Sequence, residues 1–232
     1  MIYLDNAATT KPDEDCLKSA EKYLTTEYFN PSALYKSGYG LNREIKNAKK
    51  SILSHIADSE NYDIIFTSCG TEADNQAVFC GGKRGNIVTC EGEHSAVFSA
   101  VNELKQRGFE VRFAKIKADG SVDAEHLVSL VDDKTSLVSL IHVNNETGAI
   151  NDIVKLAKTV KAKNKYCLFH SDGVQAFGKI PFRLTGDIDL YSVSAHKIGG
   201  IKGVGALIKR KNTIIKPYIY GGGQESGLRS GT

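Results

Sequence analysis

The chain alternates short runs of β-forming residues with longer segments of helical periodicity, and this alternation constrains its fold more than any other feature. Strand-like runs occur at seven places, 64–67, 86–89, 110–113, 137–141, 166–170, 190–193 and 204–208. Helical periodicity lies between the first five of these runs, at 71–81, 94–107, 123–131 and 151–163. This order predicts an α/β fold, a three-layer sandwich in which a mainly parallel sheet is flanked by helices.

Two further helical segments precede the predicted sheet, at 13–25 and 38–57. The second carries one apolar stripe, formed by Leu41, Ile45, Ala48, Ile52 and Ile56. No helix or strand is expected after the glycine run 221–223. We expect residues 1–12 to form an N-terminal arm and residues 13–232 to form one large domain.

Composition excludes several classes of function. Hydrophobic residues make up 41% of the 232 residues and charged residues 25%, which is ordinary for a globular protein. A net charge of +3 without a dense basic stripe argues against nucleic acid as a partner. No apolar run approaches the roughly 18 residues of a membrane span, and no secretory signal is visible, so a cytoplasmic protein is expected. The five cysteines include no C-x-x-C pair, which predicts free thiols and no metal site.

Lys197 stands in the motif that points most directly to chemistry, Ser194-Ala-His-Lys197. Glycines follow it closely and would let the backbone bend around the lysine. Asp172 lies upstream, directly after a predicted strand. A lysine that forms a Schiff base and an acid held against a pyridinium nitrogen are what a pyridoxal 5'-phosphate (PLP) enzyme needs. The two residues therefore predict a PLP site, with a surface lysine and a loop-capping aspartate as the alternative.

Groups suited to a phosphate occur in two places. Gly70 and Thr71 form a turn between a predicted strand and a predicted helix, where free N–H groups and the helix dipole favour an anion. Ser194 and His196 offer two more donors beside Lys197. An ordinary strand-to-helix turn with Thr71 as N-cap is the alternative for the first of these.

Three further polar residues also follow predicted strands. His94 can stack on a flat ring or move protons, Asn145 is one of two adjacent amides, and Gln175 can donate to the phenolic oxygen of a PLP ring. Taken singly, each also fits a surface histidine or a polar turn. Ligands collect at the carboxyl ends of strands in open α/β sheets, and together these motifs supply every part of a PLP site.

These residues give the chain a resemblance to a known family, the cysteine desulfurases, of the class V aminotransferase group within the fold-type I PLP enzymes. The matching stretches run in family order along essentially the whole chain. They are Tyr3 to Thr10, Asn30 to Ser32, Thr67 to Asn75, Glu93-His94, His142 to Gly148, Asp172 to Gln175, Ser194 to Lys197, Lys202 to Ala206, Gly221 to Glu225 and Arg229 to Thr232.

The resemblance implies a role for each candidate residue. It implies Lys197 as the Schiff-base lysine and proton shuttle, His94 as the ring-stacking acid–base residue, Asp172 as partner of the pyridine nitrogen and Gln175 as partner of the phenolic oxygen. Thr71, Ser194 and His196, with the Gly70 backbone, would bind phosphate, and Asn145 would lie between cofactor and substrate carboxylate. Thr232 would reach the phosphate of a partner subunit, which implies a homodimer with a shared site.

The implied reaction converts L-cysteine to L-alanine and transfers the sulfur to an enzyme cysteine, with a sulfur-acceptor protein and iron–sulfur cluster assembly downstream. The family has a smaller C-terminal domain that supplies that cysteine, and this sequence does not contain it. We therefore expect a cofactor domain without desulfurase activity of its own. Neither Cys69, where glycine is commoner, nor Cys90 is expected to accept the sulfur. The alternatives are another class V enzyme, such as selenocysteine lyase, and a non-catalytic dimerisation module.

Overall fold

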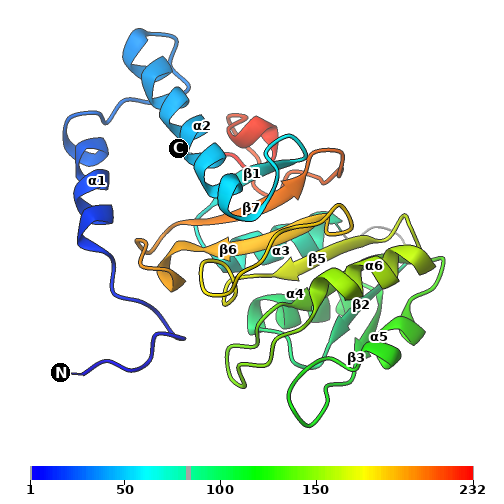
Figure 1. Cartoon of the computed structure of the whole chain (residues 1–232). Coiled ribbons are helices and arrows are strands. Elements are labelled where there is room, and N and C mark those ends of the chain that lie inside the picture. The colour runs from blue at the N-terminus through cyan, green and yellow to red at the C-terminus, as the bar shows by residue number, and fades with distance from the viewer. Residues whose placement is uncertain (1, 82–84, 232) are drawn as a thin grey trace.

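One seven-stranded sheet organises the computed structural model, which describes residues 2–81 and 85–231. The strands are β1 (Tyr62–Thr67), β2 (Asn86–Cys90), β3 (Glu110–Ala114), β4 (Thr135–Ile141), β5 (Leu168–Asp172), β6 (Leu190–Ser194) and β7 (Gly205–Arg210). All seven predicted strands are therefore present. The sheet is mainly parallel and flanked by helices, as the alternating pattern predicts (Figure 1).

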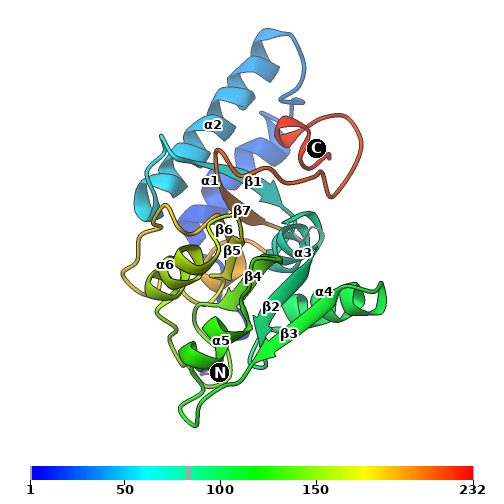
Figure 2. The same cartoon turned by 90° about the vertical axis from the view of Figure 1, so that its right-hand side faces the viewer.

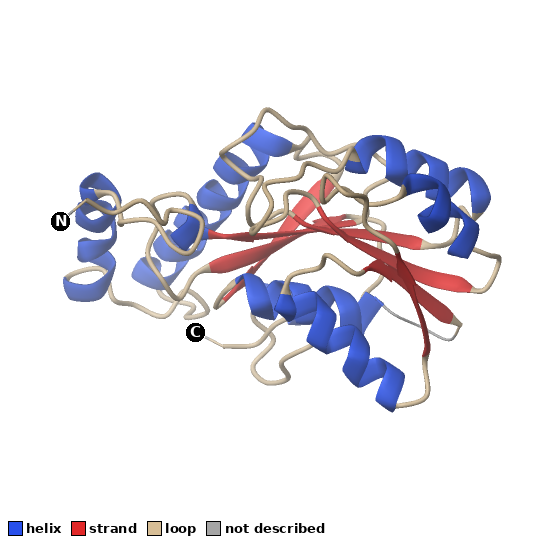
Figure 3. Cartoon of the chain, turned by 90° about the horizontal axis from the view of Figure 1, so that it is seen from below, coloured by secondary structure: helices blue, strands red, loops and turns tan. Residues whose placement is uncertain are grey.

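All the helices but α1, which lies to one side, form two layers with the sheet between them (Figure 3). They are α1 (Glu14–Thr25), α2 (Lys36–Ile56), α3 (Gly70–Gly81), α4 (Ser95–Gln106), α5 (Ala124–Leu130) and α6 (Ile153–Lys163). Buried residues of α2, α5 and α6 share one hydrophobic cluster with the sheet, whereas α3 and α4 pack on the sheet through two other clusters. The three-layer sandwich expected from the sequence is confirmed.

The strand order brings the loops that carry the predicted site residues together at the carboxyl ends of the strands. The order is β1-β7-β6-β5-β4-β2-β3, and β7 is antiparallel to both β1 and β6 while the other pairings are parallel. Strands β1, β2, β4, β5 and β6 consequently end at the same edge, and β7 begins there. Figure 2 shows the sheet from the side that carries β3 and α4. The loops after these five strands carry the motifs of Thr71, His94, Asn145, Asp172 and Lys197.

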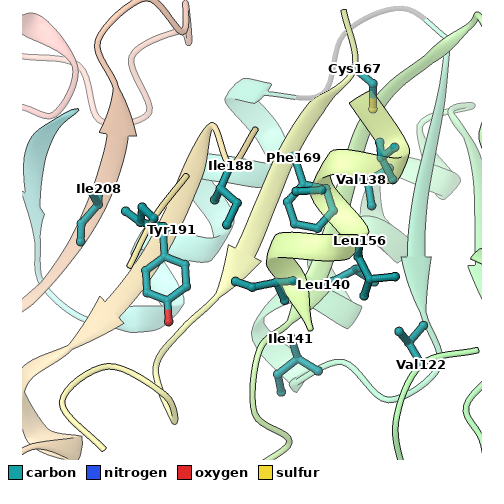
Figure 4. Packing of buried hydrophobic residues seen from close by; sticks show 14 of the residues in the cluster. Val122, Val138, Leu140, Ile141, Leu156, Cys167, Phe169, Ile188, Tyr191 and Ile208 are labelled. Carbon is teal, nitrogen blue, oxygen red and sulfur yellow. The ribbon is translucent and has the colours of Figure 1, made fainter. Parts of the chain in front are cut away.

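Packing of the sheet follows the apolar periodicity of the sequence. In α6 the predicted face of Ile153, Leu156, Ala157 and Val160 is buried. Figure 4 shows Leu156 of this helix beside Phe169, Val138 and Leu140 of the central strands. The strands that lie between both helix layers, β4, β5 and β6, are therefore almost wholly buried, and the polar residues that they contain are buried with them.

The predicted apolar stripe of α2 is only partly buried. Ile56 is buried and Ile52 packs against the core, Leu41 and Ile45 are half-buried, and Ala48 is exposed. In Figure 1 the start of this helix projects beyond the sheet. The apolar stripe therefore packs against the core only near the end of α2, where the helix lies over the sheet.

Helix α1 begins at an N-cap, Asp13, whose side chain accepts from the backbone N–H groups of Asp15 and Cys16. None of its residues is buried. One short 3₁₀ helix (Glu225–Gly227) follows the glycine run 221–223, where the sequence pattern predicts neither helix nor strand. Its backbone has positive φ at Glu225 and Ser226, a local turn geometry that no periodicity reveals. Within 2–81 and 85–231, no helix is long and apolar enough to cross a membrane.

Candidate functional site

A cavity of about 170 Å³ opens where β1, β2, β4, β5 and β6 end. Nine of the predicted site residues line it, namely Gly70, Thr71, His94, Asn145, Asp172, Gln175, Ser194, His196 and Lys197. A larger cleft of about 1010 Å³ lies beside α5 and α6 and contains none of them. The tenth predicted residue, Thr232, lies outside the described residues.

Lys197 ends the short 3₁₀ helix Ala195–Lys197, which directly follows β6. Its Nζ donates to the carbonyl oxygens of Ala7 (2.5 Å) and Ala8 (2.8 Å) in the N-terminal arm. Burial lowers the pKa of the Lys197 amine, although the negative charges of Asp172 and Asp5 oppose that effect. A lowered pKa increases the neutral fraction of the amine, the form that acts as a nucleophile or base.

Asp172 is the last residue of β5, and only 4% of its surface is exposed. Its Oδ1 accepts from the backbone N–H of Val174 at 2.9 Å. Burial raises the pKa of this carboxyl, while the Val174 hydrogen bond and the positive charges of His94 and Lys197 work against the rise. A cation placed beside Asp172 would therefore strengthen its ionised form, which is the relationship a pyridinium requires.

Two acidic groups beside Asp172 were not selected as site residues from the sequence. Asp74 lines the cavity at 1% exposure, and its carboxyl, that of Asp172 and the His94 ring have polar atoms within 4.8 Å of one another. Burial, then the charge of Asp172, raise the pKa of Asp74 well above its usual value. The sequence feature that could have indicated Asp74 is its place on the same face of α3 as the buried residues Ala73 and Ala77.

Glu93 is the second of these groups. Its Oε1 accepts from the Ile141 backbone N–H at 2.8 Å and from the Cys90 thiol at 3.1 Å, and its Oε2 is buried without a partner. Burial raises the pKa of Glu93 to about 8. Two carboxyl groups with raised pKa values therefore lie near Asp172, and the protonation of each of the three acids depends on the charge of the others.

A candidate anion cradle, formed by Gly70, Thr71 and Ser194, lies at the start of α3. The helix begins at Gly70, whose added Cβ would lie 2.8 Å from Val174 Cγ2 and 3.3 Å from Ser194 Cβ, so only glycine allows this approach. Ser194 is 3% exposed, and its Oγ has no hydrogen-bond partner within residues 2–81 and 85–231. A buried hydroxyl without a partner is unusual and points to a polar ligand beside it. His196 lines the same cavity, with Nδ1 3.1 Å from Thr9 Oγ1.

His94 and Gln175 are held by contacts that determine their orientation. His94 is the N-cap of α4, with Nδ1 accepting from the Ala96 backbone N–H at 3.1 Å. In the neutral ring the proton therefore resides on Nε2. Gln175 donates from Nε2 to the Ala7 carbonyl (2.7 Å) and accepts at Oε1 from Lys179 (2.6 Å).

Comparison with known protein families finds a match to the aminotransferase class-V family over residues 2–230. The cysteine desulfurase of Nostoc sp. is 38% identical over 237 residues, and cysteine desulfurase IscS of Rickettsia prowazekii is 39% identical over 240. Both alignments cover the whole of this chain and 58% of the relative. The chain thus spans less than two thirds of the length of these relatives. The resemblance to cysteine desulfurases is confirmed.

Solved structures give the same result for the fold. A NifS-like protein superposes with a TM-score of 0.94 at 38% identity, covering all of this chain and 65% of that one. A structure described as SspA in complex with cysteine superposes with a TM-score of 0.92 at 32% identity, covering all of this chain and 68% of that one. The expected fold-type I large-domain architecture is confirmed by these superpositions.

Proposed function

Because this chain belongs to the aminotransferase class-V family, we propose that it is the cofactor-binding part of a PLP-dependent cysteine desulfurase. The whole protein would convert L-cysteine to L-alanine and transfer the sulfur to an enzyme cysteine. The observation that carries this proposal is the single cavity that unites Lys197, Asp172 and the anion cradle of Gly70, Thr71 and Ser194. Residues 13–232 would form the cofactor domain and residues 1–12 its arm.

The donor set of the cavity fits PLP. The unpartnered Ser194 hydroxyl and the free N–H groups at the start of α3 suit a phosphate, and Thr71 and His196 would add to them. Asp172 is an acid that a positive charge would stabilise, as a protonated ring nitrogen does. Lys197 would hold the cofactor covalently. Gln175 would donate to the phenolic oxygen from the amide that now donates to Ala7.

When bound, PLP supplies an electron sink for negative charge at the α-carbon of an amino acid. The residues of the chain would position that amino acid and move its protons. Lys197 Nζ, with its lowered pKa, would accept and return a proton. His94 would lie over the ring and exchange a proton at Nε2, since Nδ1 is used as the α4 cap. Asn145, at the cavity wall, would contact the substrate carboxylate.

L-cysteine is the proposed substrate because the relatives are named cysteine desulfurases and one superposed structure is described as a complex with cysteine. We extend the proposal to a homodimer in which Thr232 contacts the partner's phosphate, and to a sulfur-acceptor protein. A role in iron–sulfur cluster assembly is the corresponding proposal for the pathway. Selenocysteine lyase activity has no specific support among these relatives.

Titration of the purified chain with PLP tests the proposal. Wild-type protein should develop a visible absorption band that survives removal of free cofactor, and Lys197→Ala should abolish the band. Lys202→Ala, which changes a lysine outside the cavity, is the matched control and should retain it. If wild-type protein produced no band, or if Lys197→Ala retained it, a PLP site at Lys197 would be excluded and a non-catalytic module would replace it.

A further inference from the structure

The five cysteines differ sharply in how readily they can react. Cys80, Cys90 and Cys167 are buried, and burial raises the pKa of each thiol, to about 11 for Cys80 and about 12 for Cys167. The thiolate is the form that attacks oxidants. Reaction with a peroxide near neutral pH is therefore confined to Cys16, exposed on α1, and Cys69, which is partly exposed.

Cys69 lines the site cavity, immediately before the residue that begins α3. Its backbone packs closely against Gly205, where an added Cβ would lie only 2.4 Å from Cys69 C and 2.6 Å from Cys69 O. Thr67 Oγ1 also donates to the Cys69 carbonyl oxygen, at 2.9 Å. The thiol accepts from Ser68 Oγ at 3.7 Å, and it is close enough to Asp74, another residue of the cavity wall, for its charge to act on that carboxyl.

The unpartnered Ser194 hydroxyl is an independent sign that a polar ligand occupies the space that Cys69 borders. Ser194 is 3% exposed, its Oγ has no hydrogen-bond partner in the part of the chain that the structure describes, and it lines the same cavity of about 170 Å³. Little room remains beside Gly70, where even an added Cβ would lie 2.8 Å from Val174 Cγ2 and 3.3 Å from Ser194 Cβ. Atoms added to the Cys69 sulfur would therefore compete with a ligand for a small and crowded volume.

We propose that Cys69 is a site of reversible oxidation by peroxide, and that its oxidised sulfur excludes the cofactor's phosphate from the cradle at the start of α3. The inference rests on the proposed PLP function and adds a form of regulation to the same site. It predicts that oxidation prevents cofactor loading, and that bound cofactor protects the thiol.

The oxidation and its reversal are both balanced. The Cys69 thiolate attacks one oxygen of hydrogen peroxide, an S–O bond forms, the O–O bond breaks, and the departing hydroxide takes a proton to become water. Sulfur loses two electrons and the peroxide gains them. A small-molecule thiol then displaces the oxygen as water to give a mixed disulfide, and a second thiol releases Cys69 with formation of a small-molecule disulfide.

An oxidised sulfur would oppose phosphate binding in two ways. It would place an additional oxygen against the N–H groups at the start of α3, which are the groups a phosphate needs. In its ionised form it would also carry a negative charge within a few ångströms of the phosphate, with little water to screen the repulsion. Neither effect arises at Cys16, because α1 contributes nothing to the cavity.

The test measures the PLP affinity of the full chain before and after treatment with peroxide. Each treated variant is compared with the same variant left untreated. Wild-type and Cys16→Ser protein should lose about tenfold or more in affinity after peroxide and recover it with dithiothreitol. Cys69→Ser should show no change on treatment. Unchanged wild-type affinity, in protein whose Cys69 is shown by mass spectrometry to be oxidised, would overturn the proposal.

Protection by inorganic phosphate provides a second measurement that does not need PLP. Phosphate should slow the oxidation of Cys69 and leave that of Cys16 unchanged, both followed by mass spectrometry of peptides. Equal rates at Cys69 with and without phosphate would contradict a shared cradle. If untreated wild-type protein failed to bind PLP, the proposed function would fail, while the phosphate measurement would still decide whether Cys69 borders an anion site.

Discussion

Gly173 is the residue at which the absence of a side chain matters most to the site. A Cβ there would lie 1.9 Å from Tyr191 Cζ and 2.3 Å from its hydroxyl oxygen. The Tyr191 ring cannot yield, because it is buried, bonded through its hydroxyl to His142 Nδ1 at 2.8 Å and stacked on Phe182. The turn that carries Asp172 therefore approaches β6 more closely than any residue but glycine allows.

The substitution Gly173→Ala should destabilise the protein by about 1–3 kcal/mol, the usual range for forcing a methyl into a packed interior. Its free energy of unfolding in urea provides the measurement. Gly186→Ala is the matched control, since no atom lies within 4 Å of its added Cβ, and it should change stability by less than about 0.5 kcal/mol. Equal effects of the two substitutions would show that Tyr191 moves aside.

Glu93 makes stability depend on pH in a direction that can be stated in advance. Its pKa is raised from 4.5 to about 8, so the folded state holds the proton more tightly than the unfolded chain. The stabilisation from that proton is complete below about pH 4.5 and is lost as pH rises through 8.

Compared with Glu93→Gln, which does not titrate, wild-type protein should lose stability across this pH range by at most about 1.4 kcal/mol per unit. Urea unfolding of both proteins at several pH values measures the difference. Glu91→Gln, in an exposed neighbour, serves as the control. A constant difference between wild type and Glu93→Gln from pH 5 to 8 would mean that the Glu93 carboxyl is not held in its neutral form.

At the scale of elements, one ion pair joins the last part of the chain to α3. Arg229 donates from Nε to Glu72 Oε1 at 2.8 Å and from Nη2 to Oε2 at 3.2 Å. Ser68, in the turn before α3, donates to the same carboxylate through both its N–H and its hydroxyl. Burial alone would raise the pKa of Glu72, but the bonds from Arg229 and Ser68 outweigh it and hold the pKa below its usual value.

Removal of this arginine in Arg229→Met should destabilise the protein by about 2 kcal/mol, because it leaves a buried carboxylate without its cation. This loss should become smaller in acid. Because the pKa of Glu72 is lower in the folded state than in the unfolded chain, its ion pair stabilises the fold above the unfolded pKa, and that stabilisation disappears as the pH falls through the folded pKa. Thermal or urea unfolding measures both. Lys18→Ala, which breaks an exposed pair with Asp15, should have almost no effect. A loss in Arg229→Met that is independent of pH would assign the effect to packing.

The positions of helices and strands could be predicted because they depend on local periodicity. The buried face of α6 and the apolar strand β4 are examples, since their patterns match the spacing of a helix and of a doubly covered strand. The 3₁₀ helix at Glu225 could not be predicted in this way. Its two positive-φ residues are held in the tertiary structure, where Glu225 accepts from Lys49 and from the Phe66 N–H.

At the scale of the whole molecule, the N-terminal arm contacts the segment that carries Lys197. Thr10 is the central residue of this contact. Its N–H and its hydroxyl both donate to the His196 carbonyl oxygen at 2.8 Å, and its Oγ1 accepts from the Gly199 N–H at 2.7 Å. Together with the bonds from Lys197 to Ala7 and Ala8, this contact joins the N-terminal arm to residues 196–199, which are far from it in the sequence.

The substitution Thr10→Ala removes both side-chain bonds and should weaken the attachment of the arm by about 1–2 kcal/mol. Backbone amides from Asp5 to Asp13 should then exchange with solvent roughly tenfold faster, as measured by hydrogen exchange and mass spectrometry. The sheet strands should keep their protection. Thr26→Ala, which removes one exposed bond to Lys22 at the end of α1, is the control. Unchanged exchange in the arm would show that its other contacts, among them those of Lys197 and Gln175 with Ala7, are enough to hold it.

The sequence by itself determined the layered α/β fold, the strand edge at which the site lies and nine of the cavity residues, because periodicity and motif position are local properties. Only the tertiary structure brought Asp74 and Glu93 close to Asp172, placed Cys69 and Ser194 in the wall of one cavity, and set the arm against Lys197. These relationships join residues far apart in the chain. Their energies arise from desolvation and from neighbouring charges, which exist only once the sheet has assembled.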